Sequence, residues 1–219
     1  ISPFFAHVFY QKRKKESKPL AVWVTLPVST DGLTSDGVNA VDLLLDEDVE
    51  LAGVNGMTMN FGGTRKSELS MGKNAIHALK KLHAQLKKIY QRQKILLSDK
   101  KVWSKIGATP MIGQNDLSNE VFTLADAKEL NQFAQKNGLG RLSIWSANRD
   151  RASTKSSVHT NIVSNFYSGV EQEDQAFSKI LKVGFDGSLL TNTAKETVSD
   201  LTEEDLVDHP ETSPYQIWS

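Results

Sequence analysis

Short apolar segments alternate along the chain with longer segments of helical periodicity, and this alternation limits the fold more than any other feature of the sequence. The apolar segments predict four strands, at 20–28, 53–61, 106–113 and 141–146. The periodic segments predict helices at 38–51, 71–90, 124–136 and around 176–181. Each strand thus precedes a helix, which is typical of βα units that build a parallel sheet.

The strands are nearly continuous apolar runs, a pattern that indicates parallel strands buried on both faces by helices. A closed eight-stranded barrel takes about 250 residues and eight βα units. The 219 residues contain four such units. The predicted fold is therefore α/β with a parallel sheet. It is either half of a (β/α)8 TIM-type barrel, with this chain supplying about four βα units, or a small open sheet.

Two helix-end signals and one composition change mark the organisation of the chain. Thr123 and Asp126 form a candidate capping box, and Asn137-Gly138 is a typical stop signal for the helix between them. Beyond about residue 184 the sequence becomes polar and acidic and closes with prolines and aromatic residues. We therefore expect one domain over 1–183 and a linker-like tail over 184–219.

Composition excludes several classes of protein. The chain has no cysteine, which rules out disulfides and thiolate metal sites. Lys+Arg and Asp+Glu both total 26, so no general attraction to nucleic acid or anionic membrane is expected. No run approaches about 18 apolar residues, so no membrane span is expected. The five histidines lack metal-ligand spacing, and "FGGTRK" lacks the spacing of a nucleotide-binding loop. We expect no metal and no cofactor.

All four predicted strands pass from apolar to polar residues within a few positions, in "TLPVSTDG", "MTMNFGG", "TPMIGQND" and "SIWSANRD". Ligands of parallel α/β folds bind at the carboxyl ends of the strands. The ends predict a shared rim that carries Asn60, Gln114, Asn115, Trp145, Asn148, Arg149 and Asp150. The flat indole of Trp145 is suited to stack on a sugar face. The alternative is that Trp145 is a core residue.

Alternation along the second strand, 53–61, divides its side chains between two faces. Asn55, Met57, Met59 and Phe61 face one way, whereas Val54, Gly56, Thr58 and Asn60 face the other. If the first set points into a barrel, Met57 and Met59 form an apolar wall and Asn60 lies at the rim. The alternative is that the methionines only fill the core.

The ordered series of motifs resembles bacterial chitinases of glycoside hydrolase family 18. The motifs are "TLPV", "VNGMTMNFG", "IGATPMIGQND", "NEVFTLADA", "LSIWSANRD" and "QAFSKIL", between about Pro19 and Leu181. The similarity is greatest to the single-domain branch, whose sixth strand usually has the sequence Met-Thr-Met-Asp-Tyr-Gly. The resemblance implies a (β/α)8 barrel in which this chain holds strands five to eight and a parent protein holds the rest. It also implies a secreted, extracellular protein.

The activity implied by the family is retaining, substrate-assisted hydrolysis of β-1,4-linked N-acetylglucosamine polymers such as chitin. Its proton donor is the last residue of Asp-x-x-Asp-x-Asp-x-Glu on strand four, which would precede residue 1. Asp46, Asp48 and Glu50 fit the end of that motif. Leu43 and Glu47 do not fit it, so we expect a solvated acidic helix end there and no catalytic residue in this chain.

The resemblance also assigns site residues. Trp145 would form the floor under the sugar at the scissile bond. Met57 and Met59 would wall the acetamido pocket, and Asn60 would hydrogen-bond near it. The substrate-binding set is completed by Phe61, Gln114 and Asn115. Asn60 and Phe61 stand where the branch has Asp and Tyr, and an amide cannot hold charge beside a developing oxazolinium.

Two alternatives remain open at this stage. The first is a non-catalytic chitin-binding or other carbohydrate-binding protein on the same fold, which the amide at Asn60 favours. The second is an unrelated open-sheet protein with another ligand. The final "SPYQIWS" is similar to the first residues of a small chitin-binding module, which fits a tail that leads to a second domain.

Overall fold

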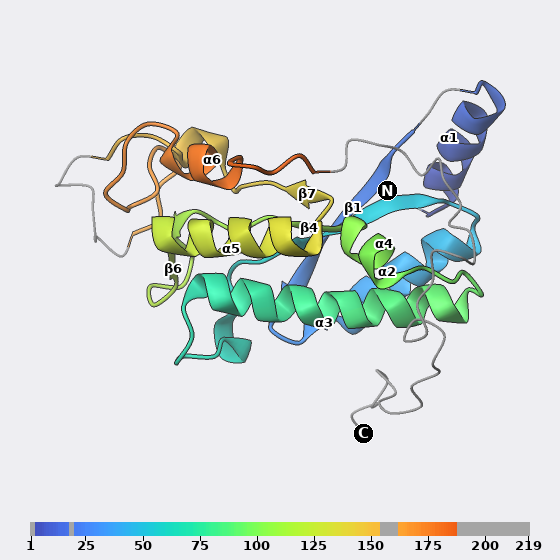
Figure 1. Cartoon of the computed structure of the whole chain (residues 1–219), viewed down its shortest axis with the longest axis horizontal. Coiled ribbons are helices and arrows are strands. Elements are labelled where there is room, and N and C mark those ends of the chain that lie inside the picture. The colour runs from blue at the N-terminus through green and yellow to red at the C-terminus, as the bar shows by residue number, and fades with distance from the viewer. Residues whose placement is uncertain (1–2, 18–19, 154–161, 188–219) are drawn as a thin grey trace.

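The computed structural model describes residues 3–17, 20–153 and 162–187, and these form an α/β fold around a five-stranded sheet (Figure 1). Four strands are parallel: β1 (Val22–Ser29), β3 (Leu51–Met57), β4 (Ile106–Ala108) and β7 (Arg141–Leu142). The short β2 (Gly32–Leu33) pairs antiparallel with β1, so the strand order is β2-β1-β3-β4-β7. A separate antiparallel pair consists of β5 (Gly113–Gln114) and β6 (Val121–Phe122).

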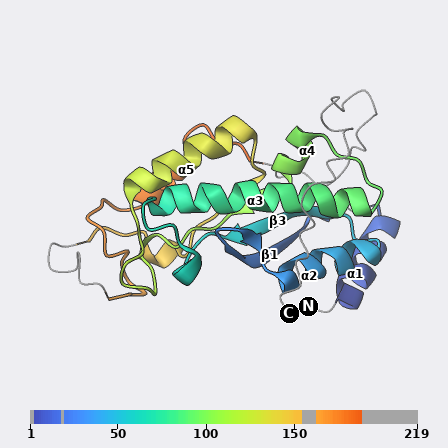
Figure 2. The ribbon, with the colours of Figure 1, turned by 90° about the horizontal axis from the view of Figure 1, so that it is seen from below.

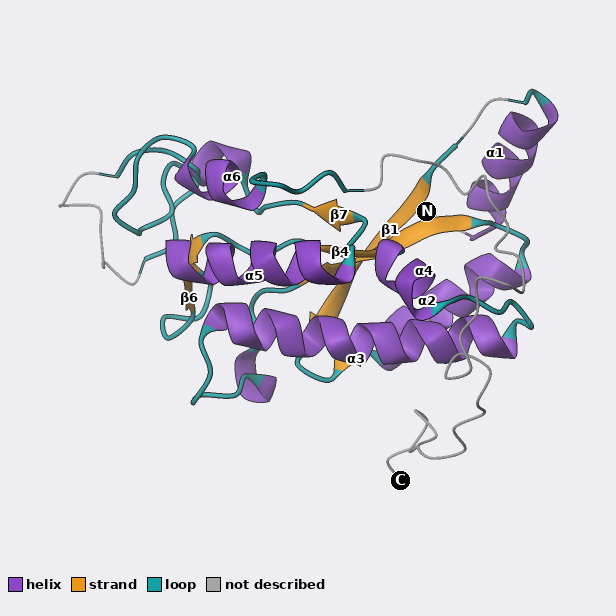
Figure 3. Cartoon of the chain, in the orientation of Figure 1, coloured by secondary structure: helices purple, strands orange, loops and turns teal. Residues whose placement is uncertain are grey.

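The helices are α1 (Pro3–Lys15), α2 (Ser35–Asp46), α3 (Met71–Arg92), α4 (Asp99–Ser104), α5 (Leu124–Asn137) and α6 (Ala176–Leu181). Two 3-10 turns, η1 (Gly62–Thr64) and η2 (Ala147–Arg149), follow β3 and β7. The long α3 packs beside α5 and crosses the sheet, as the view from below shows (Figure 2). Loop segments gather at the end of the molecule where β6 and α6 lie (Figure 3). The predicted alternation of strands and helices is therefore confirmed.

Capping side chains and a glycine define the ends of α5 and α3, and α5 ends where the sequence predicted. Thr123 and Asp126 form the expected capping box of α5, and Gly138 ends that helix with a φ of 72°. Ser70 caps α3 by accepting a hydrogen bond from the backbone of Lys73. The helix predicted over 38–51 has different limits, 35–46, because Leu51 already belongs to β3.

One face of the sheet packs on α3 and forms the core. Leu79, Leu82 and Leu86 of α3 are fully buried, and the side-chain position of Gly56 on β3 faces Leu82. The other face is polar and partly open. Asn55 is buried there and donates to Thr25 and Thr109.

The outermost parallel strands are exposed on this second face. Thr25 on β1 and Arg141 on β7 are exposed, and the Arg141 guanidinium lies 4.6 Å from the centre of the Trp23 ring. The prediction of strands buried on both faces is therefore correct for β3 and wrong for β1, whose side chains are mostly half-buried or exposed.

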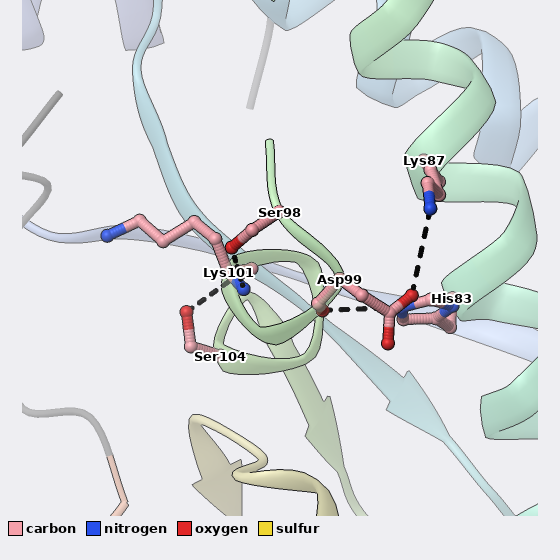
Figure 4. A network of polar contacts seen from close by, with 6 residues as sticks. All are labelled: His83, Lys87, Ser98, Asp99, Lys101 and Ser104. Carbon is pink, nitrogen blue, oxygen red and sulfur yellow. Dashed lines mark hydrogen bonds and ion pairs between the residues drawn. The ribbon is translucent and has the colours of Figure 1, made fainter. Parts of the chain in front are cut away.

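A polar network fastens α4 to α3 (Figure 4). The Asp99 carboxylate lies 3.1 Å from His83 Nε2 and 3.9 Å from Lys87 Nζ, while the His83 ring stacks on Trp103 at 4.1 Å. Ser98 caps α4 through the backbone of Lys101. His83 is therefore structural. The residues described by the structure hold no group of three metal-ligating side chains.

The same described residues contain no helix that is both long and apolar enough to cross a bilayer. Residues 188–219, which include most of the predicted tail and the "SPYQIWS" segment, lie outside the described ranges.

Candidate functional site

The carboxyl ends of β3, β4 and β7 meet at one edge of the sheet. Gly56 pairs with Ala108, and Ala108 pairs with Leu142. Three residues farther on, Met111 and Trp145 form a parallel bridge. The segments that follow these strands therefore lie side by side, as the parallel-sheet prediction requires.

Trp145 presents its indole at this edge. It is 56 % exposed, although its backbone is fixed, since its N–H donates to Pro110 O (2.9 Å) and its carbonyl accepts from Ile112 N (3.0 Å). The peptide bond to Ser146 is cis. The alternative that Trp145 is a core residue is wrong. A wide apolar ring on a fixed backbone is a ready stacking surface at low cost in conformational entropy.

The methionines at the same edge of the sheet are less open to solvent than Trp145. Met57 is half-buried, while Met59 and Met111 are buried. The strand predicted over 53–61 ends at Met57, because the chain turns there and Met59 N donates back to Met57 O (3.0 Å). The strict alternation predicted through residue 61 is therefore wrong beyond Met57.

Asn60 is exposed and joins the ends of β3 and β4. It has a φ of 51°, a left-handed conformation that asparagine tolerates well. Its Nδ2 donates to Asp116 Oδ2 (2.6 Å), and its Oδ1 accepts from Asp116 N (3.0 Å). Nδ2 also lies 4.0 Å from Met111 Sδ. One lone pair of Oδ1 is thus left for a ligand.

Phe61 and Gly62 are held by a buried carboxylate, Glu120, that the sequence did not predict as part of the site. Glu120 is fully buried and accepts from Phe61 N (3.0 Å) and Gly62 N (2.8 Å). The Phe61 ring is 5 % exposed and belongs to the hydrophobic core. An acidic residue directly before the apolar pair Val121–Phe122 was the one available signal for Glu120.

The predicted amide residues after β4 are buried within their own loop. Gln114 Nε2 donates to the carbonyls of Asn115, Leu117 and Glu120. Asn115 Nδ2 donates to the carbonyls of Met111 and Gly113, and its Oδ1 accepts from Asn60 N. These two amides are therefore buried and stabilise the loop after β4, and they are not exposed at the edge of the sheet.

Arg149 and Asp150 also support the rim from below. Arg149 is fully buried and donates to Gln114 O (2.6 Å), while its Nη1 has no hydrogen-bond partner. Burial lowers the pKa of the Arg149 guanidinium, and the charge of Asp116 opposes that shift. Asp150 is buried and accepts hydrogen bonds from Ser178 at the start of α6. Asn148 is exposed and bonds to Ser146 and to the carbonyl of Asn165.

The acidic residues that imitate part of a catalytic motif lie at the opposite edge of the sheet. Asp46 ends α2 and is exposed, and Glu50 lies just before β3 and accepts from the Tyr10 hydroxyl (2.8 Å). The prediction of an acidic helix end is confirmed for Asp46. None of the three carboxylates lies on the strand ends that carry Trp145.

Two hollows of the surface have linings that do not include Trp145. One of about 670 Å³ is bordered by Tyr10, Glu50, Tyr90 and Lys105 at the amino ends of the strands. Another of about 510 Å³ is bordered by Arg65, Lys73 and the starts of α3 and α5. The exposed indole of Trp145 thus lies outside both hollows.

The comparisons with known proteins point to chitinases. The chain is 41 % identical over 145 residues, 64 % of its length, to a protein named probable bifunctional chitinase/lysozyme from Escherichia coli (strain K12). It has the same identity over the same length with endochitinase 11 from Metarhizium anisopliae. The chain spans only 16 % and 27 % of these relatives. No protein-family model matches the chain.

Solved structures agree with this relation. The catalytic domain of a hyperthermophilic chitinase from Pyrococcus furiosus superposes with a TM-score of 0.69 at 30 % identity. The match covers 84 % of this chain and 56 % of that one. Mutants of active domain 2 of the Pyrococcus chitinase, solved in complex with chito-oligosaccharides, give the same values. The chain is therefore a relative of chitinases, with the mostly parallel sheet of their catalytic domain.

Proposed function

We propose that this chain is the carboxyl-terminal half of a family 18 chitinase-like barrel and supplies part of the cleft that binds N-acetylglucosamine polymers. The observation that carries the proposal is the exposed Trp145 at the carboxyl edge of the sheet, in a chain that is 41 % identical to chitinases. Stacking of a sugar on this indole buries apolar C–H faces against the ring.

Residues at the same edge of the sheet as Trp145 suit an acetamido sugar. Met57, Met59 and Met111 offer a polarizable apolar wall for the methyl group. The free lone pair of Asn60 Oδ1 is an acceptor for a sugar hydroxyl or amide N–H. Phe61, Gln114 and Asn115 act mainly by fixing the loops that hold these groups.

The proposal of a half barrel is supported by the open face of the sheet. Four parallel strands are described, whereas a closed barrel has eight. Thr25 and Arg141 are exposed on the outermost parallel strands, where the remainder of the parent barrel would complete the interior. The match to 56 % of the Pyrococcus catalytic domain fits this division.

In this proposal the upstream part of the parent protein supplies the glutamic acid that protonates the glycosidic oxygen. The substrate's own acetamido oxygen then attacks the anomeric carbon, so no enzyme nucleophile is needed. The described residues contribute position and shape: a floor under the sugar, a wall for its acetamido group and a fixed rim. Residues 184–219 would link the barrel to a further domain, and the parent would act outside the cell.

A non-catalytic chitin-binding protein on the same fold is the second candidate. It is favoured by Asn60, which stands where the related branch has a carboxylate and whose amide is held by Asp116. Hydrolysis assays on the polypeptide that includes the upstream strands distinguish the two. Release of sugars with retained anomeric configuration supports the hydrolase, and binding without hydrolysis supports the second candidate.

The proposed cleft is tested by calorimetric titration of the 219-residue chain with the tetramer of N-acetylglucosamine. Trp145→Ala should weaken binding about tenfold, which corresponds to about 1.4 kcal/mol. Leu96→Ala is the control, since Leu96 is also exposed (51 %) but borders the hollow at the opposite edge. Equal affinities for Trp145→Ala and the unaltered chain would overturn the proposal.

A further inference from the structure

Asp116 is the exposed carboxylate of the candidate cleft. Its Oδ2 accepts from Asn60 Nδ2 (2.6 Å), and Asn60 Nδ2 lies 4.0 Å from Met111 Sδ. Met111 in turn forms a bridge with Trp145. These contacts place Asp116, Asn60, Met111 and Trp145 in one continuous row at the carboxyl edge of the sheet.

The Asp116 carboxylate retains capacity for a ligand. Each of its oxygens can accept more than one hydrogen bond, and one bond to Asn60 occupies only part of that capacity. In the part of the chain that the structure describes, no lysine, arginine or histidine nitrogen forms an ion pair with it. The charge of Asp116 acts through space on the Arg149 guanidinium, which is fully buried.

Two further carboxylates near this row, Glu120 and Asp150, cannot take this role. Glu120 is fully buried on the backbone of Phe61 and Gly62, and Asp150 is buried on the start of α6. Asp116 is therefore the negative charge of this row that solvent and a ligand can reach. The Asn60 amide donates to the carboxylate and accepts from the backbone N–H of Asp116, so the direction of the carboxylate is fixed before a ligand arrives.

We propose that Asp116 favours a free amino group on the sugar unit next to the one that stacks on Trp145, as in partly deacetylated chitin. The ammonium of a glucosamine unit in that neighbouring position would pair with the carboxylate, whereas an N-acetyl group carries no charge. The unit on Trp145 keeps the acetamido group that the proposed hydrolysis requires. This inference rests on the proposed sugar-binding function and specifies its substrate class.

The test compares calorimetric affinities of the chain for the tetramers of glucosamine and of N-acetylglucosamine at low ionic strength. Asp116→Asn should lower the ratio of the affinity for the glucosamine tetramer to the affinity for the acetylated tetramer about fivefold. This is the size expected of a solvent-exposed ion pair. Added salt should reduce this difference in the unaltered chain. Glu47→Gln removes an equal charge from an exposed position at the opposite edge and should leave the ratio unchanged.

The outcomes distinguish the role of Asp116 from the proposed sugar-binding function. Binding of the acetylated tetramer with an unchanged ratio of affinities in Asp116→Asn would overturn the role of Asp116 and leave the proposed function intact. Failure of the unaltered chain to bind either tetramer would overturn the proposed function itself. An equal change of the ratio in Glu47→Gln would show that general charge, and not Asp116, sets the selectivity.

Discussion

The two edges of the sheet both gather polar and aromatic side chains, but they use them in different ways. At the amino edge, Tyr10 and Tyr90 are buried, and Lys105 is 5 % exposed with its Nζ on the carbonyl of Leu51 (2.6 Å) and 5.5 Å from the Tyr90 ring. At the carboxyl edge, Trp145 is 56 % exposed on a fixed backbone.

In our proposal, the amino edge supports the fold and the carboxyl edge binds the ligand. The amino-edge groups satisfy one another and join α1 and α3 to the sheet, as the Tyr10–Glu50 bond illustrates. The carboxyl-edge groups are also well bonded, but their bonds lie below the surface and leave an indole and a carboxylate outward. Polar residues alone therefore do not distinguish the two edges; the exposure of their side chains to solvent does.

The largest expected effect tests whether the carboxyl edge depends on its buried support. Glu120→Gln replaces a carboxylate that accepts two backbone N–H groups with an amide that can accept through one atom only. We expect the free energy of unfolding to fall by about 3 kcal/mol, measured by chemical denaturation. Glu68→Gln is the control, because Glu68 is an exposed acid in the loop between η1 and α3. Equal stability of both variants would contradict the role given to Glu120.

A second change tests the bond between Asn60 and Asp116. Asn60→Asp places two carboxylates where a 2.6 Å hydrogen bond now lies, so repulsion should cost about 1.5 kcal/mol at neutral pH. Repulsion raises the pKa of the pair in the folded state, and the cost should therefore shrink as the pH falls.

The double variant Asn60→Asp with Asp116→Asn serves as the control, because it restores one donor and one acceptor. Its unfolding free energy should return close to that of the unaltered chain. If the single and double variants lose stability equally, the two residues are not coupled.

The smallest effect concerns the amino edge. Burial, aided by the charge of Glu50, raises the pKa of Tyr90 above its usual value. The unfolded chain therefore ionises first, and stability that is complete below about pH 10 is lost as the pH rises further. Tyr90→Phe should make this decline shallower by roughly 1.4 kcal/mol per pH unit. Tyr167→Phe controls for the loss of a hydroxyl, and identical slopes in the Tyr90 variant and the unaltered chain would contradict the prediction.

Local sequence patterns, namely hydrophobic periodicity and helix-capping residues, predicted much of the fold. The alternating segments placed the strands and helices, and Thr123, Asp126 and Gly138 marked the ends of α5 through local hydrogen bonds and backbone geometry. The grouping of the strand ends followed from parallel topology, which brings distant segments such as Met111 and Trp145 together.

The interior of the candidate site could not be predicted in this way. Gln114 and Asn115 are amide residues of the kind that is also found on exposed rims. Only the folded path of the loop shows that their side chains are buried and donate to carbonyls of the same loop. Glu120 and Arg149 are charged residues that tertiary contacts bury completely. The turn after Met57 is equally hard to predict from the sequence, because Met59 and Phe61 continue the apolar alternation of the strand.

The most direct test of the central claim, that the carboxyl edge is the sugar-binding edge, is NMR mapping of the 219-residue chain with the tetramer of N-acetylglucosamine. We expect the indole N–H of Trp145 and the backbone amides of 57–61, 111–116 and 143–149 to shift, while those of 46–51 and 94–105 stay unchanged. Shifts that gather at the amino edge, or a Trp145 signal that does not respond while binding occurs elsewhere, would contradict the account.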